Sequence, residues 1–177
     1  MRKIIATLFT TLDGVVESPA KWSFDYPGDA IAEVVGGQMS STDTLLLGRV
    51  TYDEFAAAWP SRAAADDPGA DYMNNTPKYV VSTTLDKADW NNSTVIGMDE
   101  VAGLKEQAGG DILVSGSPTL VRSLLRKGVL DELHLLVYPI VVGSGRRLFD
   151  GAERTPLQLA TSKSFEGGVV HLAYRPA

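Results

Sequence analysis

The turn at Gly116 is the segment whose residue types most clearly suggest chemistry. The apolar run Ile112-Leu113-Val114 before it predicts a buried strand. Ser117 and Pro118 follow the glycine, and these residue types favour the N-cap and the first position of a helix. Free N–H groups and the positive dipole end at such a helix start stabilise an anion such as a pyrophosphate. The segment indicates a nucleotide site, and a plain strand-to-helix turn capped by Ser117 is the alternative.

A second turn, at Gly48, has the same organisation and strengthens the first. An apolar run ends at this glycine, and a helical pattern begins after it with Arg49 and Thr51. The Arg49 guanidinium suits a phosphate monoester, and Thr51 places a hydroxyl at the helix start. A third strand pattern ends in Ser82, Thr83 and Thr84, whose hydroxyls either cap a loop or hydrogen-bond an adenosine phosphate.

Other types of catalytic or metal site have little support in the sequence. His134 and His171 lie in predicted strands without a third ligand at metal-like spacing, so we expect ordinary strand positions and no metal. No Gly-x-Ser-x-Gly elbow occurs. The acidic pair Asp66-Asp67 is expected to be solvated. Residues 143–147, Gly-Ser-Gly-Arg-Arg, either offer arginines to a substrate phosphate or form an exposed basic turn.

Composition places the chain among ordinary globular proteins. Its 177 residues are 44% hydrophobic and 21% charged, which predicts one domain over residues 1–177. The net charge of −6, without a run of Lys or Arg, argues against nucleic acid as a partner. No apolar stretch is long enough to span a membrane, and the basic and apolar start is better explained as a buried strand than as a signal peptide. The chain has no cysteine, which fits a reducing compartment, and we expect a cytoplasmic protein.

Short β-rich runs alternate with helical patterns, which predicts an α/β fold with a mainly parallel sheet. Several runs are apolar on both faces, so helices should cover both sides of this sheet. The predicted strands are residues 4–9, 44–47, 78–82, 94–96, 112–114, 133–142 and 169–174. The predicted helices are Asp29 to Met39, Thr51 to Ala58, and a helix from Ser117 that ends before Gly128. The stretch from Trp59 to Thr76 has no sustained period and predicts a long surface loop or lid.

The order and spacing of six short segments resemble a known family. They are residues 11–14 (Thr-Leu-Asp-Gly), 47–52, 79–83, 114–117, 130–133 and 139–149. Together they are similar to the dihydrofolate reductase-like superfamily, and most of all to stand-alone relatives of the C-terminal reductase domain of the riboflavin-biosynthesis deaminase-reductase. The resemblance covers nearly the whole chain. It implies a three-layer fold, with a mixed sheet and antiparallel C-terminal strands, that binds NADPH.

The resemblance also implies roles for individual residues. Arg49, Ser82 and Thr83 would contact the 2′-phosphate of the cofactor. The loop at Gly14 would border the nicotinamide, and Trp22 would either cover that ring or plug the space beneath the loop. The pyrophosphate would be held by Thr51 and by Gly116, Ser117, Pro118, Thr119 and Leu120, and Gly48 would also belong to the cofactor site.

Two departures from the family pattern concern the substrate. Riboflavin reductases have a lysine where this chain has Thr7, and an acidic residue where it has Ser115. A ribosylaminopyrimidine phosphate therefore loses part of its expected contacts. The family's usual glycine pair is here Gly116-Ser117, which leaves open whether the peptide between them is cis.

Two functions follow as expectations. The first is an NADPH-dependent reductase that transfers hydride to a small flat heterocycle, either a pterin or a pyrimidine like 5-amino-6-(5-phosphoribosylamino)uracil. Asp13, Asp25 and Glu33 are the candidates for proton delivery, with water as the alternative. The second is a non-catalytic nucleotide-binding or scaffold module that keeps the fold. Because relatives with long final strands often pair through them, the resemblance also implies a homodimer.

Overall fold

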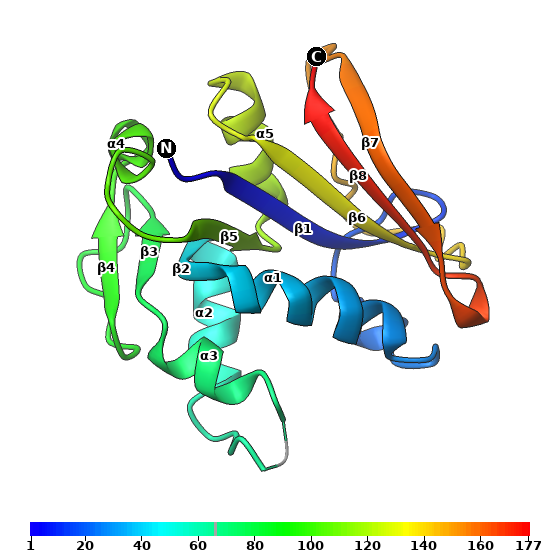
Figure 1. Cartoon of the computed structure of the whole chain (residues 1–177), viewed down its shortest axis with the longest axis horizontal. Coiled ribbons are helices and arrows are strands. Elements are labelled where there is room, and N and C mark those ends of the chain that lie inside the picture. The colour runs from blue at the N-terminus through cyan, green and yellow to red at the C-terminus, as the bar shows by residue number, and fades with distance from the viewer. Residues whose placement is uncertain (66) are drawn as a thin grey trace.

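The computed structural model describes residues 1–65 and 67–177. Its centre is an eight-stranded sheet with the strand order β4-β3-β2-β5-β1-β6-β8-β7 (Figure 1). The six strands from β4 to β6 are parallel, whereas β8 is antiparallel to β6 and β7 is antiparallel to β8. The strands are β1 (Ile4–Thr11), β2 (Thr42–Gly48), β3 (Lys78–Val81), β4 (Ser93–Ile96), β5 (Asp111–Ser115), β6 (Glu132–Tyr138), β7 (Leu157–Ser164) and β8 (Val170–Pro176).

Helices cover both faces of the sheet, as we predicted from strands that are apolar on both faces. The side chains of β2 alternate between the two faces of the sheet, with Leu45 and Leu47 on one face and Leu46 on the other. On the first side lie the helices α1 (Gly36–Ser41), α2 (Arg49–Ala58) and α3 (Ala70–Asn75), and on the second lie α4 (Val101–Leu104) and α5 (Pro118–Arg126). The α/β class and the mainly parallel sheet are confirmed.

The first helix has a local irregularity in its middle. Helical backbone runs over residues 29–41, and residues Ile31–Val35 form a π turn before α1 begins at Gly36. The predicted helix from Asp29 to Met39 is thus confirmed, and Gly36-Gly37 does not end it. Three short 3₁₀ turns complete the helices, at Pro19–Lys21, Met98–Glu100 and Glu166–Gly168.

Two expectations about the connections were wrong, and one strand was missed. The strand predicted over residues 133–142 ends at Tyr138, because Pro139 lacks the N–H that would continue the ladder. The stretch from Trp59 to Thr76 is not one loop, since its second half contains α3, whose Ala70 and Met73 are buried. The strand β7 was missed because its side chains are almost all exposed, so no apolar alternation marks it.

Two sequence expectations concern solvation and membranes. Asp66 lies outside the described residues, while its neighbour Asp67 is half-buried and forms an ion pair with Arg62 at 2.9 Å. Asp67 is therefore not a freely solvated acid. Within residues 1–65 and 67–177, no helix has the length and apolar character needed to cross a membrane.

Candidate functional site

The two glycine turns predicted from the sequence meet at the carboxyl edge of the sheet. They come together because β2 and β5 are adjacent parallel strands that end at the same edge. The Gly48 N–H donates to the Ser117 hydroxyl at 2.8 Å, and the Ser117 N–H donates to the Thr51 hydroxyl at 3.1 Å. A Cβ on Gly48 would lie 3.2 Å from that Ser117 oxygen, so this position needs glycine for close approach.

The structure changes the role predicted for Ser117. Its backbone is left-handed, with φ 58°, and its side chain makes no capping hydrogen bond to α5, because the hydroxyl is held by Gly48. The Gly116 N–H donates to the Thr7 carbonyl at 3.0 Å, and all described peptides are trans. Since Pro118 has no N–H, the backbone donors left at this helix start belong to Thr119 and Leu120. An anion would therefore contact the first turn of α5 rather than the glycine itself.

Arg49 and Ser82 end neighbouring strands, as Gly48 pairs with Val81 in the sheet. The Arg49 guanidinium is partly exposed, and its Nε donates to Asp53 at 2.7 Å, one turn later on α2. The Ser82 hydroxyl accepts N–H bonds from two residues of the following turn, at 3.2 and 3.0 Å. Thr83 is exposed beside it. The cluster offers one partly exposed cation and two hydroxyls to an anionic group.

The loop that contains Gly14 is held by the Asp13 carboxylate. This carboxylate accepts from the Thr11 hydroxyl at 2.6 Å and from the Val142 and Gly143 amides at 3.3 and 3.0 Å. The Thr11 hydrogen bond, together with the two amides, holds the pKa of Asp13 below its usual range against the opposing effect of desolvation. The group is thus an ionised tether for the loop, which makes it a poor proton donor.

Arginines of residues 143–147 complete this tether. The Arg147 Nε donates to the Asp13 carbonyl at 2.9 Å, and its Nη2 lies 3.6 Å from the Asp13 carboxylate. Arg146 pairs with Glu17 at 3.4 Å. Both arginines therefore bind acidic residues of the Gly14 loop. The sequence could not distinguish this role from phosphate binding, because the contacts join residues that lie about 130 positions apart in the chain.

Trp22 lies beneath the loop as part of the core. It is 6% exposed, packs edge-on against Tyr138 with ring centres 5.4 Å apart, and donates its indole N–H to the Glu17 carbonyl at 3.2 Å. These contacts are those of an aromatic plug that supports the loop from below.

The remaining acidic candidates lie apart from the glycine turns. Asp25 is exposed in the turn that precedes the first helix. Glu33 is exposed on the side of that helix that faces β7, where its carboxylate binds Lys163 Nζ at 2.6 Å. The structure therefore does not bring Glu33 to the Gly14 loop. Asp25 follows Trp22 closely in the sequence, and its side chain is open to solvent.

Thr7 occupies the centre of the sheet beside the two turns. It pairs with Ser115 across β1 and β5, is 6% exposed, and donates its hydroxyl to Gln38 Oε1 at 2.7 Å. The Gln38 Nε2 is buried without a hydrogen-bond partner. The chain thus has a neutral hydrogen-bonded pair where the resembling reductases have a lysine.

The two histidines form a pair that the sequence did not predict. His134 Nδ1 and His171 Nε2 are 2.9 Å apart, and His134 Nε2 lies 3.2 Å from Glu132. The antiparallel register of β6 and β8 creates this contact, and no local pattern signals it. Burial lowers the pKa of His171, and the neighbouring His134 lowers it further. Within the described part of the chain, no group of three or more metal-ligating side chains occurs.

Comparison with known proteins assigns the family. The family model "RibD C-terminal domain" matches residues 2–171. The chain belongs to the RibD C-terminal domain family. It is also 30% identical to the YyaP protein of Bacillus subtilis (strain 168) over 98% of this chain and 94% of YyaP.

Solved structures of RibD and dihydrofolate reductase share the fold. A protein of Shewanella sp. PV-4, whose name links it to riboflavin biosynthesis, matches with a TM-score of 0.76 and 18% identity, over 99% of both chains. The deaminase and reductase of Thermotoga maritima matches with a TM-score of 0.70 and 16% identity, over 99% of this chain and 57% of that protein. Dihydrofolate reductase of Enterococcus faecalis, complexed with NADP(H), matches with a TM-score of 0.65 and 15% identity, over 98% of this chain and 96% of the reductase. The resemblance stated from the sequence is confirmed.

Proposed function

We propose that this RibD C-terminal domain protein is an NADPH-dependent reductase of a small flat heterocycle. The observation that carries the proposal is the joined pair of glycine turns at the carboxyl edge of the sheet, where Gly48 and Ser117 bind each other. This edge is where open α/β sheets bind ligands. The match to a dihydrofolate reductase complexed with NADP(H) supports a nicotinamide cofactor.

The donors at this edge fit the phosphates of NADPH. Backbone N–H groups of Thr119 and Leu120 would hold the pyrophosphate, because the first turn of α5 has no acceptors for them within the helix. Arg49 would leave Asp53 and bind the 2′-phosphate with Ser82 and Thr83 beside it. The Gly14 loop, tethered through Asp13, would cover the nicotinamide and exclude water.

When bound, NADPH supplies the hydride, and the protein aligns the acceptor with the nicotinamide. Because Asp13 is held as a carboxylate and Glu33 is paired with Lys163, we propose water as the proton source. No strong nucleophile is required for this chemistry.

The charges around the site favour an unphosphorylated heterocycle such as a pterin. Thr7 is neutral and bound to Gln38, while Arg146 and Arg147 bind Glu17 and Asp13. A phosphoribosyl group would have to break one of these pairs. A phosphorylated pyrimidine is therefore the less favoured of the two substrate classes.

Enzyme assays separate catalysis from binding. NADPH oxidation is followed against pterins, flavin precursors and quinones, and consumption with one class of heterocycle is the expected result. Thermal unfolding with NADPH, NADH and ATP provides the binding arm, and the absence of any shift with NADPH would refute the cofactor assignment. A shift with NADPH but no turnover across a broad panel favours the second candidate, a non-catalytic nucleotide-binding or scaffold module, which the tethered Asp13 also supports.

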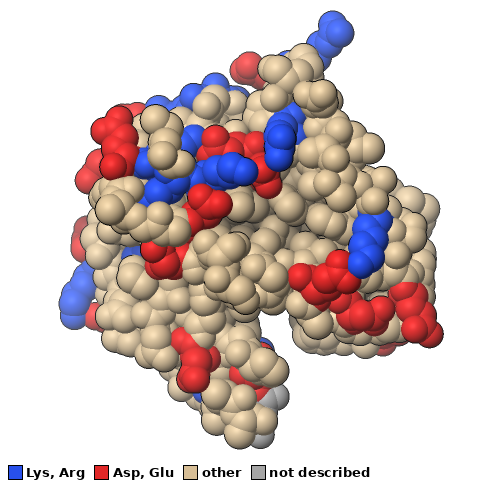
Figure 2. Space-filling model, in the orientation of Figure 1, with Lys and Arg blue, Asp and Glu red and all other residues tan. Residues whose placement is uncertain are grey.

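We also propose a cytoplasmic homodimer that binds neither nucleic acid nor membrane. The edge strand β7 leaves nearly all its side chains exposed, including Leu159, and offers unpaired backbone groups to a second copy (Figure 1). Basic and acidic side chains are interleaved on the face drawn in Figure 2, which gives nucleic acid no continuous basic stripe there. Light scattering after size exclusion tests the dimer, and a monomeric mass at high concentration would contradict it.

A further inference from the structure

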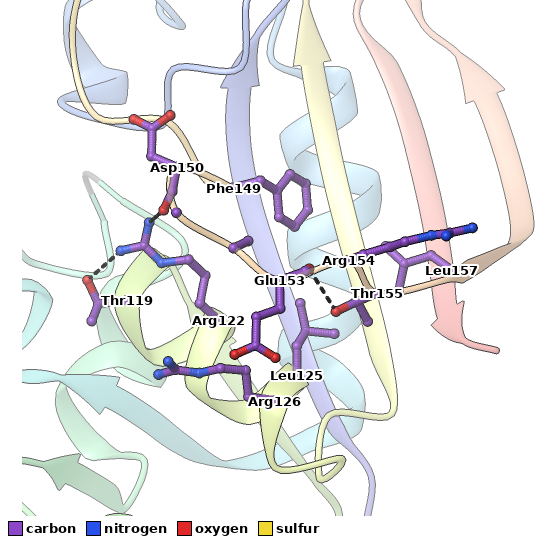
Figure 3. Close-up of a pocket in the computed structure, with 12 residues that line it drawn as sticks. Thr119, Arg122, Leu125, Arg126, Phe149, Asp150, Glu153, Arg154, Thr155 and Leu157 are labelled. Carbon is purple, nitrogen blue, oxygen red and sulfur yellow. Dashed lines mark hydrogen bonds between the residues drawn. The ribbon is translucent and has the colours of Figure 1, made fainter.

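A cavity lies on the side of α5 that faces away from Gly48. It has a volume of about 630 Å³ and is bounded by the helix and by residues 149–155, which connect toward β7 (Figure 3). The inner side of α5 faces the cofactor edge, because a Cβ on Gly48 would lie 3.6 Å from Leu120. The outer side carries Arg122, Leu125 and Arg126 instead, which line the cavity.

Arg122 is held in place at the cavity by neutral acceptors. Its Nη1 donates to the Asp150 carbonyl at 2.8 Å and to the Leu148 carbonyl at 3.5 Å, and its Nη2 donates to the Thr119 hydroxyl at 3.3 Å. These hydrogen bonds orient the guanidinium without neutralising its charge. A pre-oriented guanidinium loses little side-chain entropy when it binds a carboxylate or phosphate.

Two further arginines have no ion pair in the part of the chain that the structure describes. Arg126 is exposed and donates to the Ser123 hydroxyl at 3.2 Å, and Arg154 is an exposed lining residue of the segment 149–155. The only acidic side chains that line the cavity are Asp150 and Glu153, so its formal charge is +1 in a chain whose net charge is −6. This local excess of positive charge attracts anions.

The cavity also has apolar walls. Leu125 and Leu157 line it, and Phe149, which is 46% exposed, lines it as well. Figure 3 shows the Phe149 ring beside the segment that carries Glu153 and Arg154. A ligand that contacts both kinds of wall needs a charged head and an apolar body.

We propose that this cavity binds a small organic anion, with its phosphate or carboxylate head on Arg122 and Arg126 and its aromatic or apolar body against Phe149. The site adjoins the proposed NADPH site at Thr119, which lines the cavity, but Arg122 and Arg126 project from α5 in other directions than Leu120. Glu153 limits the affinity, since its carboxylate lines the same cavity as Arg126 and repels an anion.

Calorimetric titration of the whole protein with phenyl phosphate tests the proposal. We expect one site, weaker binding of inorganic phosphate, and no binding of phenol, because both parts of the ligand contribute. Benzoate serves as the carboxylate arm and shows which head group is preferred. Equal affinities for phenyl phosphate and inorganic phosphate would refute the apolar part of the site.

Variants locate the binding. Arg126→Ala should weaken phenyl phosphate about tenfold, as expected for the loss of a charge-assisted hydrogen bond. Glu153→Gln should strengthen it, which cannot result from misfolding. Arg62→Ala is the matched control, since Arg62 pairs with Asp67 far from α5 along the chain, and it should leave the affinity unchanged.

Arg49→Ala separates this site from the cofactor site. Phenyl phosphate affinity should be unaffected by that variant even if NADPH binding is lost. If Arg49→Ala abolishes phenyl phosphate binding while Arg126→Ala does not, the anion binds the cofactor edge and the proposal is wrong. Binding that is equally weak in all variants would also refute it.

Discussion

The Gly48 amide donates a hydrogen bond to the Ser117 hydroxyl at 2.8 Å, and the Ser117 amide in turn reaches the Thr51 hydroxyl at 3.1 Å. These two bonds join turns that are 69 residues apart in the chain. The starts of α2 and α5 are thereby held in one orientation before any ligand arrives. Pre-organisation of this kind lowers the entropic cost of binding.

Replacement of Ser117 by alanine should loosen both turns. The Gly48 N–H loses its acceptor, and alanine must adopt the left-handed backbone that Ser117 now has, so we expect a loss of about 1–2 kcal/mol of stability. Urea unfolding measures the change. Ser123→Ala, at a half-buried position of α5 away from the two turns, is the control and should cost less than about 0.5 kcal/mol. Equal stability of the two variants would show that the hydrogen bond contributes nothing.

Replacement of Arg49 by alanine should separate the two nicotinamide cofactors. If Arg49 binds the 2′-phosphate, NADPH affinity falls about tenfold or more while NADH affinity hardly changes. Asp53→Asn frees the guanidinium from its 2.7 Å ion pair and should preserve or improve NADPH binding. Fluorescence titration with both cofactors gives the comparison. Equal losses for NADPH and NADH in Arg49→Ala would contradict the 2′-phosphate role.

Protonation of Asp13 should release the Gly14 loop at acid pH. Its folded pKa lies below the value of 3.8 that holds for an unperturbed Asp, so its stabilising contribution is present above that pH. The contribution is lost as the pH falls through the folded pKa, because the unfolded chain binds the proton first. The free energies of unfolding of wild type and Asp13→Asn, plotted against pH, should therefore converge in acid and diverge near neutral pH. Parallel curves throughout would rule out an ionised tether.

His171 should make stability depend on pH in a higher range. Its pKa is lowered by burial and by His134, with Lys163 also lowering it and Glu33 opposing, so the folded protein resists protonation. Stability is full above about pH 6.5 and decreases as the pH falls below it, since the unfolded chain takes up the proton more readily. His171→Gln should flatten that part of the curve. NMR titration of the imidazoles checks the direction directly, and a His171 pKa above 6.5 would contradict the expectation.

The strands and the two turns could be predicted from residue types and local periodicity. Apolar runs such as Leu45-Leu46-Leu47 define buried strands, and Gly116 followed by Ser117 and Pro118 defines the start of α5. The edge strand β7 escaped prediction because its side chains are exposed on both faces. A strand without a buried face leaves no periodic pattern in the sequence.

The sequence by itself therefore determined which residues end the strands at the carboxyl edge, and with them Gly48, Arg49 and Gly116 as a candidate site. Only the tertiary structure decided what those residues do there. Ser117 binds Gly48 rather than its own helix, and Asp13 binds the Gly143 amide of a distant loop. These roles depend on strand order and on contacts between distant loops, because a polar group takes the partner that the fold brings within hydrogen-bond distance.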